Sequence, residues 1–357
     1  MVSGFYVTTP IYYVNAEPHL GHAYTTIVGD ALSRWHRLLG DDVMYLTGTD
    51  EHGLKIRQAA DAAGQTPQAF CDTIAPKFAD AWTRLNITND DFIRTTEPRH
   101  YAAVKELLQR CYDAGDIELD TYSGKYCVAC EEYFTDEELL DDSLCPIHKR
   151  PVDHFEEENY FFRLSRFQDR LLKWYDEHPG VIKPEFRGNE ALGLIRGGLR
   201  DFSVSRTSLD WGIPLPWDER HVAYVWFDAL TNYLSATGFG DPSVDYTNRW
   251  PVDYHLIGKD IIRHHCVYWP AMLMSAGVDL PKGWAVGGWL LVDGEKMAKS
   301  TGNVVNPLDL IDVVGVDGFR YYVLAETSYG SDGDFSFEGL VGRYNADLAN
   351  NLGNLAA

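Results

Sequence analysis

Residues 5–22 read FYVTTPIYYVNAEPHLGH, an apolar run followed by the start of a helix. The run Phe5–Thr9 predicts a buried strand, and apolar residues then recur at helical spacing over Ile27–Leu39. The same alternation returns in the strand-like run Val43–Thr47 and the helical stretch Val104–Tyr112. Alternating strands and helices predict βαβ units on a parallel sheet. The expected fold class is therefore α/β, with a split, doubly wound, Rossmann-like sheet.

The tetrapeptide His19-Leu20-Gly21-His22 opens the predicted helix. At a spacing of three residues, His19 and His22 share one face of the first turn. Free backbone N–H groups and the positive end of the helix dipole favour an anion there, and Gly21 lets a flat base or a phosphate approach the backbone. An ordinary helix start explains the same four residues, so the tetrapeptide alone does not establish a nucleotide site.

A second segment, Lys296-Met297-Ala298-Lys299-Ser300, lies near the end of the chain. It sets two lysines beside Gly294 and Gly302, which predicts a cationic loop suited to charge that grows on a phosphate during reaction. Alone, it reads equally well as a solvated turn. The order of the two segments, the strand before the first and their long separation favour one ATP site built from both. The sequence contains neither GxxxxGK[ST] nor a dinucleotide-binding GxGxxG, so such a site uses another device.

The middle of the chain differs in texture from its two ends. Between about Gly115 and Ala223, turn residues, clustered cysteines and short aromatic runs such as Tyr160–Phe162 predict an inserted α+β module. Sheet-like runs resume at Tyr224–Phe227, Tyr254–Ile257 and Trp284–Val292, with a helix predicted over Ile261–Met274. The expected parts are 1–114 (first half of the Rossmann-like domain), 115–223 (insertion), 224–292 (second half) and 293–357 (lysine segment, stem-contact region and start of a truncated helical domain). A split sheet brings both signature segments to its carboxyl edge, where ligands bind in open α/β folds.

Four residues of the predicted insertion have the spacing of zinc ligands. Cys127 and Cys130 form one C-x2-C hook, and Cys145 and His148 form a C-x2-H hook after a short spacer. Three thiolates and one imidazole suit a closed tetrahedral site, which has no open position for water and is therefore structural. A chance loop or a pair of reactive thiols would give the same pattern. We expect one structural Zn²⁺ per chain.

Composition limits the cellular context and the partners. No signal peptide and no apolar run long enough to span a membrane is visible, which predicts a cytoplasmic protein without a membrane partner. The formal net charge of −22 argues against nucleic-acid binding by bulk charge, and no DNA partner is expected. An RNA partner would have to meet local basic patches. The remaining cysteines are scattered and do not resemble a disulfide framework.

Together these motifs resemble those of the class I aminoacyl-tRNA synthetases, and within that class the methionyl-tRNA synthetase family of the bacterial type with one zinc knuckle. The resemblance also rests on four further segments: Thr9–Asn15 (TPIYYVN), Thr47–Gly53 (TGTDEHG), Val225–Leu230 (VWFDAL) and Ile257–Pro270, which begins IGKD and ends YWP. It implies that the insertion presents the tRNA acceptor end, and that a helical anticodon-binding domain would follow the start of a helix at Asn345–Ala357. One departure is Ala298, where the family's second signature usually has serine.

The resemblance implies ATP-dependent activation of L-methionine and its transfer to the 3′ end of tRNA(Met), with Mg²⁺ accompanying ATP. It assigns His19 and His22 to the triphosphate and Lys296 and Lys299 to the transition state. The implied nucleotide contacts are Gly21 and Leu290 for adenine and Gly258 and Asp260 for ribose. The implied methionine pocket comprises Ile11, Tyr13, Asp50, Trp226, Ala229, Tyr233, Ile261 and His265, with Tyr268 and Trp269 as mobile neighbours. Asp50 would pair with the substrate ammonium, although it could equally cap the helix that begins near Leu54.

Other readings of the two signatures remain open. Synthetases for isoleucine, valine or leucine carry a large editing domain, for which the predicted insertion leaves little room. A cysteine-specific enzyme would hold zinc in its active site rather than in an insertion. Small nucleotidylyltransferases also use a His-x-Gly-His helix start but are typically much shorter. The last alternative, a non-catalytic RNA-binding relative, is disfavoured by the lysine pair.

Overall fold

A computed structural model describes residues 4–128, 132–134, 138–141, 143–147, 149–292, 294–297 and 302–357. Its main sheet has seven strands in the order β2-β3-β1-β12-β13-β8, with β4 pairing with β3, and every pairing in it is parallel. The strands are β1 (Gly4–Thr8), β2 (Tyr12–Tyr13), β3 (Asp42–Asp50), β4 (Asp91–Arg94), β8 (Ile182–Lys183), β12 (Tyr254–Gly258) and β13 (Trp284–Gly287). The predicted α/β fold with a parallel sheet is confirmed.

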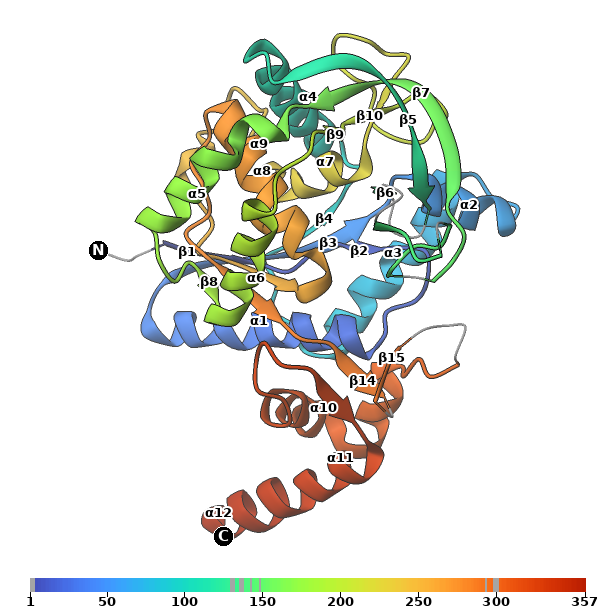
Figure 1. Cartoon of the computed structure of the whole chain (residues 1–357). Coiled ribbons are helices and arrows are strands. Elements are labelled where there is room, and N and C mark those ends of the chain that lie inside the picture. Colours follow the sequence, from blue (N-terminus) through green and yellow to red (C-terminus); the bar gives the residue numbers. More distant parts are fainter. Residues whose placement is uncertain are drawn as a thin grey trace.

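Helices cover both faces of this sheet, as Figure 1 shows. Helix α1 (Leu20–Leu39) lies along one face, and α4 (Pro98–Asp113), α8 (Asn232–Ser235) and α9 (Trp269–Ala276) lie over the other. Because both faces are covered, the strands carry near-continuous apolar runs, and Tyr6, Val7, Tyr45 and Leu46 are all buried. The remaining helices of the first 230 residues are α2 (Leu54–Ala62), α3 (Pro67–Arg84), α5 (Gln168–Glu177), α6 (Glu185–Arg196) and α7 (Val225–Leu230).

The predicted insertion begins with two long antiparallel strands. β5 (Ile117–Cys127) and β7 (Asp153–Phe162) curve away from the main sheet, with the short strands β6 (Glu132–Phe134) and β9 (Phe202–Ser203) at their sides (Figure 1). The 115–223 range is not separate throughout, however. β8 pairs with β13 in the main sheet, and Tyr175 and Ile195 of α5 and α6 belong to the main core. The middle of the expected insertion thus returns to the parent sheet.

Two local predictions were wrong. Residues Tyr224–Phe227 do not form a strand, because Val225–Leu230 is the helix α7, preceded by the two-residue strand β11 (Val222–Ala223), which pairs with β10 (Ser205–Arg206). The single helix expected over Ile261–Met274 is instead a succession of a 3₁₀ turn at Lys259–Ile261, a π-helical segment at His264–Tyr268 and then α9. A π-helical segment is rare and is frequently found at functional sites.

The C-terminal part joins the main domain through a small sheet and a helix. β14 (Leu290–Val292) pairs with β15 (Glu295–Lys296) and β16 (Gly333–Phe335), and α10 (Pro307–Ala325) packs against α1. The chain ends in α11 (Phe337–Arg343), a π-helical stretch over Tyr344–Leu352 and α12 (Gly353–Ala356). Within the described part of the chain, no helix combines the length and apolarity needed to cross a bilayer.

Candidate active site

A cavity of about 980 Å³ lies where the carboxyl ends of β1, β3 and β12 meet the start of α1. Every predicted catalytic, ATP-binding or methionine-binding residue that the structure describes lines it. These are Ile11, Tyr13, His19, Gly21, His22, Asp50, Trp226, Ala229, Tyr233, Gly258, Asp260, Ile261, His265, Leu290 and Lys296. Lys299 and Ala298 fall outside the described residues. Segments from both ends of the chain therefore meet around one cavity.

The two histidines of the first signature fix the start of α1. His19 is the N-cap residue, and its Nδ1 accepts a hydrogen bond of 3.1 Å from the backbone N–H of Gly21. In return, Nδ1 of His22 accepts a hydrogen bond of 3.3 Å from the backbone N–H of His19. The two imidazole rings are stacked, with their centroids 3.7 Å apart. Because each Nδ1 acts as an acceptor, each ring carries its proton on Nε2. These reciprocal hydrogen bonds form a capping box and leave the Nε2–H group of each histidine as a donor.

Both imidazoles are held neutral. Burial, together with the nearby charge of Lys296, lowers the pKa of His19 to about 4. Burial followed by the charges of His19 and Lys55 lowers the pKa of His22 well below its usual value. Around pH 7 the pair therefore offers hydrogen-bond donors without positive charge. Positive charge at the cavity comes from other groups, among them Lys296 and the N-terminus of α1.

Lys296 supplies positive charge at the cavity. It lies on β15, a short strand antiparallel to β14, with its ammonium 3.4 Å from Asp260 Oδ2 and 4.2 Å from the centre of the Trp289 ring. Trp289 also lines the cavity, although it lies outside the motifs from which the site was predicted. The sequence gives one signal for Trp289: it lies among Gly287, Gly288 and Leu290, just before the lysine signature.

A buried hydrogen-bonded pair defines one wall of the predicted methionine pocket. Nδ1 of His265 donates to the carbonyl oxygen of Ile261 at 3.0 Å, so Nε2 is left to accept from the Tyr233 hydroxyl at 2.8 Å. Burial is the main cause that lowers the pKa of His265 to about 4, so this ring too is neutral. Beside the pair, the Trp226 ring stacks on His264 with centroids 3.7 Å apart. The pocket wall is therefore aromatic, and the direction of the hydrogen bond between Tyr233 and His265 is fixed.

Asp50 lies at the end of β3, where its neighbour Tyr13 is paired in register on β2. It is 3% exposed and does not cap α2, whose N-cap residue is Gly53. The adjacent Glu51 anchors this turn, because its carboxylate accepts from Arg94 Nε at 2.6 Å and from the Thr96 hydroxyl at 2.7 Å. The carboxylate of Asp50 is thus held at the cavity wall by a rigid turn.

A second buried network, which the sequence analysis missed, links the Asp50 turn to α7. The Asp228 carboxylate lies 2.7 Å from Nδ1 of His52 and 2.6 Å from Nε2 of His100. Burial alone would raise the pKa of Asp228, but the two imidazoles hold it below its usual value. His52 lies in the segment TGTDEHG and Asp228 in the segment VWFDAL. The sequence could have indicated this network only if these two segments were expected to lie close together.

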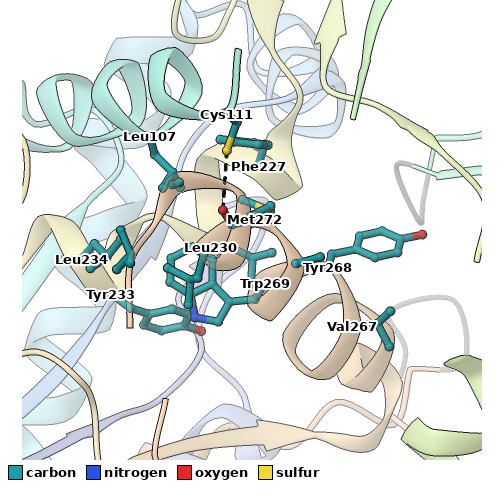
Figure 2. Close-up of a cluster of buried hydrophobic side chains, with 14 of the residues drawn as sticks. Leu107, Cys111, Phe227, Leu230, Tyr233, Leu234, Val267, Tyr268, Trp269 and Met272 are labelled. Carbon is teal, nitrogen blue, oxygen red and sulfur yellow. Dashed lines mark hydrogen bonds between the residues drawn. The ribbon is translucent and has the colours of Figure 1, made fainter. Parts of the chain in front are cut away.

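The two predicted mobile neighbours do not line the cavity. Trp269 is fully buried, and its indole N–H donates to Nε2 of His255 at 3.2 Å. Figure 2 shows the Trp269 ring packed beside Tyr233, Leu230 and Leu234, while the Tyr268 ring points away from this cluster. In this structure both residues therefore belong to the supporting core rather than to the cavity wall.

Two glycines of the predicted nucleotide site leave space that a side chain would fill. A Cβ on Gly21 would lie 3.1 Å from Cε1 of His19, and a Cβ on Gly258 would lie 2.6 Å from Oδ1 of Asp260. Substitution of either residue would displace a side chain that lines the cavity. The close approach expected for a base or a sugar thus has a geometric basis.

Only two of the four predicted zinc ligands are described. Cys127 and Cys145 are buried in one small cluster with Phe134 and Leu139, whereas Cys130 and His148 fall outside the described residues. Over the described ranges, no three His, Cys, Asp or Glu side chains gather as a metal site would require. The neighbouring Ile147 and Arg150 line the cavity, so this part of the insertion reaches the site.

Comparison with known proteins agrees with this geometry. The sequence matches the family described as "tRNA synthetases class I (M)" over residues 5–152 and 138–357. It is 51% identical to the "Methionine--tRNA ligase" of Streptomyces coelicolor over 99% of this chain and 67% of that protein. It is 52% identical to the protein of the same name from Thermotoga maritima, over 98% of this chain and 56% of the relative. The chain thus spans between about half and two thirds of these relatives.

Solved structures give the same relationship. The chain superposes with a TM-score of 0.96 and 50% identity on Mycobacterium tuberculosis methionyl-tRNA synthetase in complex with methionyl-adenylate, over 99% of this chain and 70% of that one. The TM-score is 0.86, at 46% identity, for the apo form of that enzyme, over 100% of this chain and 68% of the other. The motifs, the sheet order and the near full-length similarity agree, and the chain belongs to the class I tRNA synthetases, in their methionine family.

Proposed function

We propose that this chain activates L-methionine with ATP and transfers the methionyl group to the 3′ end of tRNA(Met). In the first step a carboxylate oxygen of methionine attacks the α-phosphorus, and the bond to the β-phosphate breaks to release pyrophosphate. In the second step a terminal ribose hydroxyl of the tRNA attacks the carbonyl carbon and releases AMP. The observation that carries this proposal is the single cavity lined by neutral His19 and His22, by Lys296 and by an aromatic pocket ending at Asp50.

The phosphate end of the cavity supplies donors and charge rather than a nucleophile. Nε2–H groups of His19 and His22 would donate to phosphate oxygens, since both Nδ1 atoms are occupied by backbone N–H groups. Lys296 and the predicted partner Lys299 would neutralise the charge that develops as the phosphorus–oxygen bond breaks. Gly21 and Leu290 would contact adenine, with Gly258 and Asp260 at the ribose. In-line positioning then accounts for the rate without a covalent enzyme intermediate.

The other end of the cavity fits a thioether side chain with a free ammonium group. Trp226 and Tyr13 line this end, and sulfur–ring contacts stabilise by about 0.3–1.5 kcal/mol each. The Tyr233–His265 pair sets a polar group against this apolar wall, and Asp50 would receive the ammonium. The names of the relatives, and the methionyl-adenylate in the Mycobacterium tuberculosis complex, support methionine over leucine or isoleucine.

Two metals fit the residues present. Mg²⁺ would enter with ATP, held largely by the phosphates, and would help neutralise them. We propose Cys127, Cys130, Cys145 and His148 as the ligands of one structural Zn²⁺, and the burial of both described thiols in one small cluster is compatible with this donor set. The zinc would hold the loop that carries Ile147 and Arg150 at the cavity mouth.

The decisive experiment is amino-acid-dependent exchange of pyrophosphate into ATP. Methionine should drive the exchange and leucine should not, and the protein should then charge tRNA(Met). Exchange without any amino-acid dependence would instead favour nucleotidyl transfer. A complete lack of exchange would contradict both catalytic readings.

A further inference from the structure

Four residues form a set of contacts at the cavity, which we name the lysine cradle: Asp260, Trp289 and Lys296, which line the cavity, and Lys259 behind them in the chain of contacts. The Trp289 ring centre lies 4.0 Å from the ammonium of Lys259 and 4.2 Å from that of Lys296. Asp260, next to Lys259 in sequence, lies 3.4 Å from the Lys296 ammonium and closes the set. Both cations are within the distance at which an indole face attracts a positive charge.

One side of the cradle is held by hydrogen bonds to the backbone of Trp289. Lys259 is tied to Asp332 at 2.7 Å, and the same carboxylate accepts from the backbone N–H of Trp289 at 2.9 Å. The carbonyl oxygen of Trp289 accepts from Gly333 at 2.9 Å. A Cβ at the adjacent Gly288 would lie 2.1 Å from the carbonyl oxygen of Ser331, so the two segments are too close here for a side chain. The indole therefore projects from a backbone that is hydrogen-bonded through both the N–H and the carbonyl group of Trp289.

Lys296 is the more exposed of the two lysines. Its side chain is 48% exposed, whereas that of Lys259 is 20% exposed. Among the residues that the structure describes, its one carboxylate partner is Asp260, at a longer distance than the Lys259–Asp332 pair, and Asp260 is itself 39% exposed and lines the cavity. Under the proposed function, Asp260 would receive the ribose of ATP. Substrate binding would then weaken the ion pair and leave Lys296 with the ring face.

We infer that Trp289 is a positioning residue for Lys296: its ring keeps the ammonium at the cavity rim when the nucleotide occupies Asp260. This inference rests on the proposed function and deepens it. A preorganised ammonium needs less rearrangement when charge appears on the phosphates, so the benefit falls on the chemical step rather than on ATP binding. Trp289 itself need not touch the reacting atoms.

The test compares Trp289→Leu with Trp289→Phe in methionine-dependent pyrophosphate exchange. Trp289→Leu should lower kcat about two- to fivefold with little change in KM for ATP, which is the size expected for one rim cation–ring contact. Trp289→Phe keeps a ring face and should recover most of kcat. Trp289→Met repeats the loss of the ring with a flexible side chain if the leucine variant unfolds. Trp35→Leu, at an exposed position of α1, is the matched control and should leave exchange unchanged.

A double-mutant cycle separates positioning from a general structural effect. In a Lys296→Ala background, Trp289→Leu should cause no further loss, because the ring would have no ammonium to hold. An equal loss in both backgrounds would overturn the inference, as would a Trp289→Phe variant as slow as Trp289→Leu. If the wild type exchanges normally and Trp289→Leu has the same kcat, this inference alone would be overturned. A wild type without methionine-dependent exchange would overturn the proposed function and this inference together.

Discussion

The hydroxyl of Tyr233 donates a hydrogen bond of 2.8 Å to Nε2 of His265, inside a wall where both residues are buried. The direction of this bond is fixed from the far side of the ring, because Nδ1 can only donate to the carbonyl oxygen of Ile261. Both residues of this pair line the cavity. A side chain in this pocket therefore lies beside a hydrogen-bonded pair whose donor and acceptor are fixed.

Tyr233→Phe removes this donor while it preserves the ring. We expect kcat/KM for methionine to fall about tenfold, since a buried acceptor on His265 loses its partner at a cost of about 1–3 kcal/mol. KM for ATP should stay close to the wild-type value, because Tyr233 lies at the methionine end. Steady-state exchange with each substrate varied in turn measures both constants. An equal rise in both KM values would contradict a role confined to methionine.

The lowered pKa values of His19 and His265 predict that the free energy of unfolding decreases as the pH falls. Burial depresses the pKa of His19 and of His265 to about 4 in the folded chain, against a usual value near 6.5. The unfolded chain therefore takes up protons first as the pH falls, and stability is present above pH 6.5 and lost between about pH 6.5 and 4. Each such histidine contributes a slope of up to about 1.4 kcal/mol per pH unit.

Urea unfolding at several pH values between 7 and 4.5 measures this slope. His19→Gln should flatten it by up to one proton. A wild-type slope near zero over this range would contradict the neutral state assigned to these rings.

Much of the fold and of the candidate site could be read from the sequence because the signals are local. The strand runs at Phe5 and Val43 and the helix opened by His19 need only hydrophobic periodicity and a cap. The strand predicted at Tyr224–Phe227 was wrong, because aromatic and β-branched residues have a high strand propensity that the folded chain does not follow here. Tertiary contacts override this propensity: the backbone N–H of Tyr224 donates to the carbonyl oxygen of Val204, after which the chain turns into α7.

Other features could not be predicted because they depend on residues that only the folded chain brings together. β8 has two residues, too few for any periodicity, and it enters the main sheet through its pairing with β13. The carboxylate of Asp228 meets His52 and His100 across separations of 176 and 128 residues. The contact between Trp289 and Lys296 likewise depends on the turn between β14 and β15.

A buried ion pair should hold the C-terminal helix α10 against α1. Asp30 is fully buried, and its Oδ2 accepts from Arg320 at 2.5 Å and from Arg34 at 2.7 Å. Arg320 is 11% exposed and also donates to the carbonyl oxygen of Leu85, whereas Arg34 is 39% exposed. Arg320→Met should lower the free energy of unfolding by about 2–4 kcal/mol, because it leaves a buried carboxylate less well paired.

Arg34→Met is the matched variant, since both arginines donate to the same oxygen. It should cost about 1 kcal/mol or less, as expected for a more exposed pair. Chemical denaturation of the two variants gives the comparison. Equal losses would show that burial does not govern this pair.

The last prediction concerns the proposed zinc ligands. Cys145→Ser should reduce bound zinc, measured by elemental analysis, because a tetrahedral site loses one of its four donors. Cys111→Ser is the control: its thiol is equally buried but donates to the carbonyl oxygen of Met272, as Figure 2 shows, and zinc content should not change. Ile147 and Arg150 reach the cavity beside this loop, while the methionine and phosphate residues come from other elements. Loss of zinc should therefore impair tRNA charging more than pyrophosphate exchange, and an equal loss of both activities would contradict a role limited to the insertion.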